Sequence, residues 1–323
     1  MYRYTIVRIL LMIPTIIGAG TLVFFLMRII PGDICLTRWV DYGTNLDPSL
    51  LELCRDQLGL NNPLFEQFVS FLKNICSLDF GLSMYTGNSM SIELGDRFAL
   101  SFQVAIMALT LTVFVAIPLG VLAARQHNTW IDHSIRLISI AGVATPSFWL
   151  GILMLIGILT FSQHFFLSPW MPPIVYVSPF EDLFENLCQL VWPAIAVGLR
   201  YICITVRMTR SSMLEVLSSD YIRTARSRGI SEYNLARNHA LKNAFLPVLT
   251  ILGSEFAFMI GGLVITEQVF NLNGLGALLV QSVEDADYII VQNLVMLFAF
   301  IFVIVNFIID IIYSYLDPRI RYS

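Results

Sequence analysis

The sequence contains few of the residue patterns on which enzymes depend. It has two lysines, Lys73 and Lys242, and a leucine precedes each of them. A phosphate-binding P-loop needs Gly-Lys before Ser or Thr, so the chain cannot bind ATP in that way. His-Glu-x-x-His and Gly-x-Ser-x-Gly are absent as well. We therefore expect no catalytic residue, metal or cofactor in this chain.

Histidine and cysteine do not change this expectation. The four histidines are scattered and the five cysteines lack metal-ligand spacing. Cys35, Cys54 and Cys76 share one segment, where one disulfide at most could form and leave one thiol over. The simpler interpretation treats all the cysteines, Cys188 and Cys203 included, as small buried hydrophobic residues. Nucleic-acid binding is disfavoured, because no basic patch outside one loop is interleaved with aromatics that could stack on bases.

Apolar residues are what the sequence has in excess. They make up 57% of the chain, charged residues make up 13%, and the mean hydropathy is +0.74. Soluble domains average roughly 25% charged residues, so the composition indicates a membrane protein. Six runs are long enough to cross a bilayer, the first of them as an uncleaved N-terminal span. They are Ile9–Ile30, Phe98–Ala124, Leu137–Phe161, Val191–Val206, Ala244–Phe270 and Ile289–Tyr313.

The distribution of basic residues predicts the orientation of these spans. The short loops His164–Leu190 and Asn271–Tyr288 contain acidic residues but no lysine or arginine. Basic residues instead accompany the two termini and the alternate loops, so both termini are expected in the cytoplasm. The long segment 31–97 carries four basic residues, but long loops cross largely regardless of charge.

The segment 31–97 is too long for a simple connection and predicts a small helical subdomain on the outer surface. Asp47-Pro48 is a typical helix start, and Pro63 opens a second helix. Its apolar face could pack on the protein or lie among lipid headgroups, and consists of Leu64, Phe65, Phe68, Phe71, Leu72 and Ile75. The expected organisation is residues 1–30 as the tail and first span, 31–97 as the subdomain, and 98–323 as the core.

The most distinctive segment is a basic loop at 207–247 within that core. Met213–Gly229 is predicted to be one helix, ended by a glycine in the left-handed conformation. Leu214, Leu217, Tyr221 and Ala225 recur at helical spacing and form an apolar ridge. With the small Ala225 near its tip, this helix is suited to entering a groove on a partner. The alternative is a basic amphipathic helix that lies on anionic membrane lipid.

The amino-acid sequence of Asp220–Ser231 and His239–Pro247 resembles the ATPase-coupling loop of ABC importer permeases. The resemblance is to the dipeptide, oligopeptide and nickel branch of that family. The generic loop begins Glu-Ala-Ala, where this chain has Arg223, Thr224 and Ala225. Further similar motifs follow in the same order over almost the whole length. They are Arg8–Thr15, Arg28–Asp33, Leu58–Leu60, Leu78–Gly81, Ile117–Val121, Pro146–Gly151, Thr266–Phe270, Gly274–Gly276 and Leu316–Arg319.

The resemblance implies an all-α permease of the bacterial inner membrane, with six transmembrane helices and a cytoplasmic coupling helix. It also implies a second homologous permease, two ATP-binding subunits that hydrolyse the ATP, and a periplasmic substrate-binding protein. The expected substrates are di- or oligopeptides, with nickel chelates, glutathione or other small solutes as alternatives. The residues expected to contact the ATPase are Tyr221, Arg223, Thr224, Ala225, Arg226 and Gly229.

Three charged residues within the apolar runs are candidates for the translocation pathway, because charge is costly in lipid. They are Arg200, Glu255 and Glu267. Arg200 and Glu255 could meet peptide termini, or they could form an internal ion pair or contact a second permease. The acidic residues also leave open a different class, a secondary transporter driven by an ion gradient. That class does not explain the basic loop.

Overall fold

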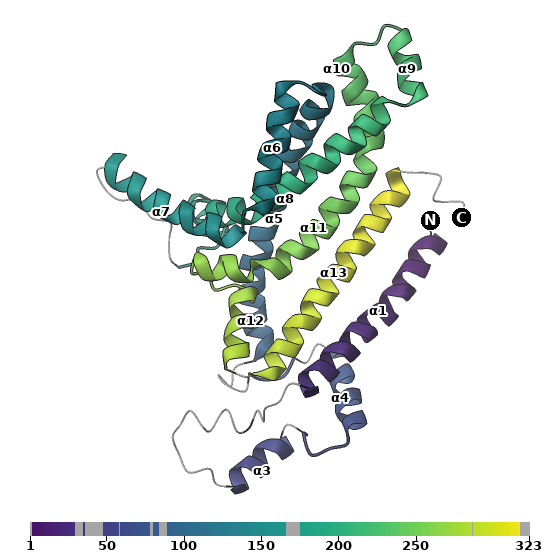
Figure 1. Ribbon diagram of the computed structural model, residues 1–323. Helices are drawn as coiled ribbons and strands as arrows, with labels where there is room; N and C mark the ends of the chain where they lie inside the picture. The colour runs from purple at the N-terminus through teal and green to yellow at the C-terminus, as the bar shows by residue number, and fades with distance from the viewer. Residues whose placement is uncertain are drawn as a thin grey trace. The chain divides into compact units, whose positions relative to one another are not determined.

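The computed structural model of the protein describes residues 2–29, 35, 48–57, 59–77, 80–83, 89–165, 175–285 and 287–316. No β-strand occurs among them, which confirms the all-α prediction (Figure 1). Asp47 and residues 317–323 lie outside the described residues. The α-helices are α1 (Tyr2–Ile29), α3 (Pro48–Gln57), α4 (Leu64–Cys76), α5 (Met90–Arg125), α6 (Trp130–Ala144), α7 (Ser147–Phe165), α8 (Leu183–Leu217), α9 (Asp220–Ser227), α10 (Glu232–Asn234), α11 (Leu241–Val269), α12 (Leu275–Glu284) and α13 (Tyr288–Leu316).

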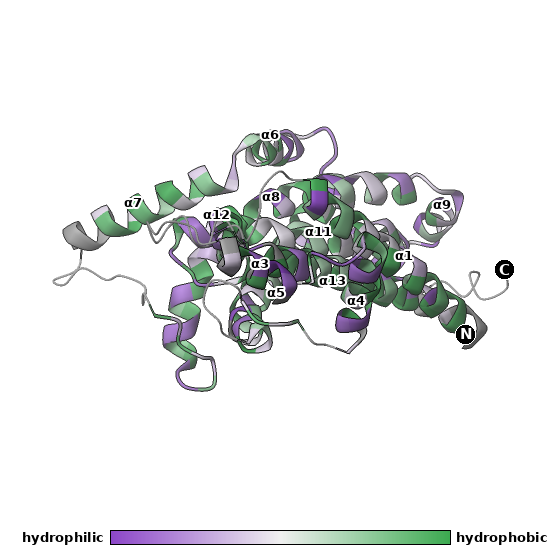
Figure 2. Cartoon of the chain, turned by 90° about the horizontal axis from the view of Figure 1, so that it is seen from below, coloured by the Kyte–Doolittle hydropathy of each residue, from purple (hydrophilic) through white to green (hydrophobic). Residues whose placement is uncertain are grey.

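Five of the described helical stretches are long and apolar enough to cross a membrane. Each of them overlaps one of the six predicted spans, so five are matched. The remaining predicted span, Leu137–Phe161, is the third in chain order and is divided between α6 and α7. These two helices bend by 99° at a short break, and they make a sixth span if they are counted together. Figure 2 shows α7 largely in green and pale tones, in keeping with its apolar sequence.

The break between α6 and α7 corrects the expectation of one straight third span. Thr145 has the extended conformation, φ −81° and ψ 121°, and precedes Pro146. The ring of a proline disfavours the helical conformation in the residue before it, so the helix ends there. Pro118, Pro193 and Pro247 lie inside α5, α8 and α11 instead.

The chain divides into two compact units, residues 1–99 with 273–304 and residues 100–272 with 305–323. In the first unit α4 packs on α1. The ring of Phe24 lies 5.3 Å from that of Phe68 and 5.8 Å from that of Phe71. The Arg28 guanidinium donates to Gln67 Oε1 at 3.1 and 2.9 Å. The predicted face of α4 is thus partly buried, while Leu64 and Phe65 at its beginning stay exposed.

Residues 273–304 belong to the same unit as residues 1–99. The linear division of the sequence did not include this grouping. A buried cluster joins the beginnings of α5, α12 and α13. The Asp287 carboxylate accepts a hydrogen bond from the Ile290 amide at 3.2 Å and so caps α13. Asn293 donates to the Phe80 carbonyl at 2.7 Å. The cluster consists of Met90, Leu94, Leu275, Leu278, Ile290 and Leu294.

The second unit is organised around α8, which packs against α6, α7 and α11. Its contact with α6 is close because Gly142 faces Cys203, and any β-carbon at Gly142 would collide with that thiol. Gly120 of α5 meets Thr209 of α8 in the same way. Small residues at such contacts let membrane helices approach closely. Cys203 and Cys188 are free thiols and Cys35 is disulfide-bonded, whereas the side chains of Cys54 and Cys76 lie outside the described residues.

Candidate coupling site

The basic loop begins where α8 ends, and the predicted single helix Met213–Gly229 is wrong. The chain leaves the helix at Ser218 and Ser219, and Ser219 is extended with φ −70° and ψ 153°. Each hydroxyl bonds a carbonyl at the end of α8, Ser218 to Glu215 at 2.7 Å and Ser219 to Val216 at 2.6 Å. Serine competes with the backbone in this way, which favours a break.

The C-terminal end of α9 lies where the sequence predicted it. Gly229 has φ +80°, which confirms the expected left-handed residue after the helix. Ser231 then begins α10, where its Oγ accepts a hydrogen bond from the Asn234 amide at 3.5 Å. A π-helical segment, Leu235–Ala240, continues from α10 into α11. The chain therefore turns back at α9 (Figure 1).

Buried apolar side chains attach α9 to the rest of the unit. Ile222 is fully buried, and Leu214, Leu217 and Ala225 are partly buried against the same group. The predicted ridge thus faces the chain's own interior, apart from Tyr221, which is exposed. We call this group the loop cluster: Ala124, Met213, Ile222, Leu235, Ala236, Ala240 and Ala244.

Hydrogen bonds of Tyr221 and of Arg226 close the loop around this cluster. Asn243 Nδ2 donates to Tyr221 Oη at 2.7 Å, and Tyr221 Oη donates to the His239 carbonyl at 3.4 Å. Arg226 donates to the two carboxylate oxygens of Glu232 at 2.6 and 3.2 Å. Hydrogen bonding to Glu232 raises the pKa of the Arg226 guanidinium. These contacts cross the turn at Gly229.

The outward side of α9 is polar and basic. Arg223, Thr224 and Arg228 are exposed. Arg223 lies 3.4 Å from Asp220, but the two side chains are 71% and 96% exposed, so water competes strongly for this pair. Thr224 Oγ1 donates to the Asp220 carbonyl at 3.0 Å. The surface that α9 offers to a partner is therefore formed by charged and hydroxyl groups, with the Tyr221 ring beside them.

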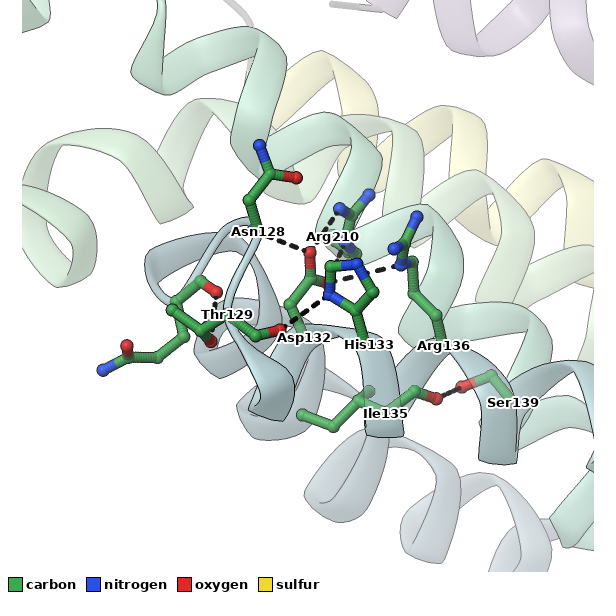
Figure 3. Close-up of polar contacts among 9 residues, drawn as sticks. Asn128, Thr129, Asp132, His133, Ile135, Arg136, Ser139 and Arg210 are labelled. Atoms are coloured by element: carbon green, nitrogen blue, oxygen red, sulfur yellow. Dashed lines mark hydrogen bonds and ion pairs between the residues drawn. The ribbon is translucent and has the colours of Figure 1, made fainter.

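A buried ion pair joins the beginning of α6 to α8 before the loop (Figure 3). Arg210 donates through Nε to Asp132 Oδ1 at 2.6 Å and through Nη2 to Oδ2 at 2.8 Å. The Asn128 amide donates to Asp132 Oδ2 at 3.1 Å, and Arg136 Nε lies 3.8 Å from Oδ1. The Asp132 side chain is 0% exposed and that of Arg210 is 16% exposed. A bidentate pair of this kind fixes both groups in direction as well as distance.

Sequence reasoning missed this ion pair, as well as Ile222, Glu232 and Asn243. Asp132 and Arg210 are 78 positions apart, and no periodicity connects them. For Ile222 a signal existed, since an isoleucine in a short polar helix marks its buried side.

The charged residues within the apolar runs are not brought together. Glu255 is buried and accepts a hydrogen bond from Thr205 Oγ1 at 2.7 Å. Glu267 is buried and accepts one from Ser101 Oγ at 2.6 Å. Arg200 is exposed and forms no ion pair with Glu255, so that internal pair is excluded. Among the described residues, no three His, Cys, Asp or Glu side chains gather as a metal site.

Comparison with known proteins matches both halves of the chain to one type of protein. Residues 116–322 match the family of binding-protein-dependent transport system inner membrane components, and residues 1–99 match its N-terminal region. A Brucella abortus protein provisionally named a peptide transport system permease is 38% identical over 311 residues, 96% of each chain. The glutathione transport system permease protein GsiC of Escherichia coli is 35% identical over 323 residues, 100% of each chain.

Proposed function

The chain belongs to the family of binding-protein-dependent transport system inner membrane components, and on this basis we propose that it is the permease subunit of an ATP-driven importer of di- or oligopeptides. As a multi-pass transport permease of the ABC importer type it is not itself an enzyme. The observation that carries the proposal is the α9 loop. It presents an exposed basic surface on a short helix that is attached to the end of a long apolar one.

Two ATP-binding subunits, a second homologous permease and a periplasmic substrate-binding protein complete the proposed complex. ATP is bound and hydrolysed by the partner subunits, whose closure moves α9. Because Ile222 anchors α9 in the loop cluster, movement of α9 is passed to α8 and α11. The two permeases then change from an inward-facing to an outward-facing state, and the binding protein releases its substrate into the cavity.

Within this proposal the site residues divide into two groups. Tyr221, Arg223 and Thr224 lie on the exposed surface and contact the ATPase subunit directly. Arg226 is exposed too, but it also ties α9 to Glu232. Ala225 and Gly229 shape the helix, the first by packing against the loop cluster and the second by its left-handed turn.

The peptide substrate rests on the naming of the Brucella relative and on the resemblance of the sequence motifs. Glutathione is the second candidate, because GsiC is named for it, and nickel chelates and other small solutes follow. Arg200, Glu255 and Glu267 are the proposed pathway residues. An exposed guanidinium suits a peptide carboxylate, and a buried carboxylate beside a hydroxyl suits an amino group.

Uptake into proteoliposomes tests this function. The chain is reconstituted with candidate ATPase, second permease and binding-protein subunits from the same organism, and entry of a radiolabelled tripeptide is followed. We expect uptake that needs ATP, continues with a protonophore present, and is reduced by unlabelled di- and tripeptides. Competition by glutathione or nickel chelate alone would reassign the substrate. Uptake driven by an ion gradient without ATP would overturn the proposal in favour of a secondary transporter.

The proposed orientation, with both termini and α9 in the cytoplasm, has its own test. Single cysteines at Asn61, Asp285 or Ser231 are introduced into a chain whose Cys188 and Cys203 are replaced by serine. Labelling is scored as the increase over the same chain without an introduced cysteine, because a thiol left over in segment 31–97 can react as well. An impermeant maleimide should label the first two in intact spheroplasts and the third only after the membrane is opened. Labelling of position 231 from outside would contradict the orientation.

A further inference from the structure

A cavity of about 600 Å³ lies between α6, α8 and α11, at the end of α8 that leads to α9. Three arginines line it, Arg136, Arg207 and Arg210. Its apolar lining includes Ile140, Ile204 and Ile251, and the Ile140 side chain is exposed. The cavity thus combines a basic part with an apolar wall formed by α6 and by α8 and α11, which are long and apolar enough to cross a membrane.

The charges around this cavity do not balance. Asp132 is the carboxylate paired with these arginines among the described residues, and both of its oxygens are bonded to Arg210. Arg136 Nε is buried and lacks a hydrogen bond, since Asp132 Oδ1 is 3.8 Å away. Arg207 is exposed. The lining therefore carries two positive charges in excess and a buried N–H group without an acceptor, which is costly unless an acceptor arrives.

We propose that this cavity binds the phosphate of an anionic membrane lipid such as phosphatidylglycerol. A phosphate oxygen supplies the acceptor that Arg136 lacks, and Arg207 adds a second charged contact. The acyl chains of the lipid lie along the isoleucines. Basic pockets between transmembrane helices are known to bind anionic lipid headgroups. Free phosphate has the same headgroup chemistry but cannot use the apolar wall. This inference does not depend on which solute the permease carries.

Native mass spectrometry of the full-length chain in detergent tests the site. The protein is incubated with phosphatidylglycerol or with phosphatidylcholine, and retained lipids are counted for wild type, Arg136→Gln and Arg207→Gln. Arg210 is left unchanged, because its loss would strand the buried Asp132. Arg228→Gln is the matched control, since it removes an exposed arginine of the α9 loop that lies outside the cavity. Elution volume and circular dichroism establish that each variant is folded.

We expect wild type to retain phosphatidylglycerol over phosphatidylcholine, and each cavity variant to lose about fivefold in affinity. Arg228→Gln should bind like wild type, and 10 mM inorganic phosphate should not displace the lipid. Equal retention of phosphatidylglycerol by wild type and both cavity variants would overturn the proposal. Equal retention of the two lipids by wild type would do the same. Displacement by inorganic phosphate at that concentration would overturn the lipid as the ligand and assign the site to free phosphate.

Discussion

The α9 loop and the ion pair between α6 and α8 use the same residue types in opposite ways. In the loop, Arg223 and Asp220 approach each other in water, where the pair contributes little to stability. Between α6 and α8, Arg210 and Asp132 are buried and meet in bidentate geometry. The loop is instead held mainly by buried apolar residues, those of the loop cluster.

This difference separates the charges available to a partner from those committed to the fold. Without Arg210, the buried Asp132 carboxylate would keep only the Asn128 amide and the more distant Arg136 as partners. Arg223 and Arg228 can exchange water for a partner's acidic groups at small cost. Our proposal therefore places the basic docking surface on α9, although α8 also carries arginines nearby, including the exposed Arg207. Four substitutions test this comparison.

The largest expected effect is that of Arg210→Met. Removing one partner of a buried ion pair costs about 3–5 kcal/mol, because the other charge stays buried and unpaired. Thermal denaturation of the purified permease in detergent should show a large decrease in stability. The double variant Asp132→Leu with Arg210→Met should recover most of it. An Arg210→Met protein as stable as wild type would remove the distinction between the two regions.

Ile222→Ala should have the next largest effect, confined to the loop. Replacing a buried isoleucine by alanine costs about 2–4 kcal/mol where the site cannot collapse. We expect α9 to detach while the spans stay folded. Limited trypsin digestion should then cleave at Arg223, Arg226 or Arg228 at least about tenfold faster than in wild type. Thr224→Ala, on the exposed side of the same helix, is the control. Equal cleavage rates would show that Ile222 does not anchor α9.

Gly229→Val should have an intermediate effect of conformational origin. No atom lies within 4 Å of a β-carbon placed there, so the change creates no clash. The left-handed backbone instead costs a branched residue about 1–2 kcal/mol. In the reconstituted complex we expect loaded binding protein to stimulate ATP hydrolysis less than it does with wild type. Gly229→Asn, which tolerates this backbone, should retain stimulation. If valine and asparagine behave alike, the left-handed turn is not required.

The smallest effect on stability is expected for Arg223→Gln, with a melting temperature within about 2 °C of wild type because the charge is exposed. The functional effect should nevertheless be clear, because the ATPase subunits should co-purify with the variant less well. Arg237→Gln, which removes an exposed arginine from the π-helical segment, should co-purify normally. Loss of stability without loss of ATPase binding would reverse the roles given to the two regions.

Much of this architecture could be predicted from the sequence, because a bilayer imposes a minimum length on apolar runs. That constraint located five spans, and a sixth apolar run that is bent between α6 and α7. Pro63 and Gly229 marked a helix start and a helix end through their own backbone preferences. The family was inferred differently, from the resemblance of motifs that follow one another in order along the chain.

Other features depended on contacts between distant residues. Only the tertiary structure shows that Asp132 meets Arg210, that Glu255 bonds Thr205 rather than Arg200, and that Ala225 packs against its own chain. Periodicity identifies an apolar face but not what covers it. Leu214, Leu217 and Ala225 could have faced a partner, and they face inward because α10 and the start of α11 fold back and bury Ile222 beside them.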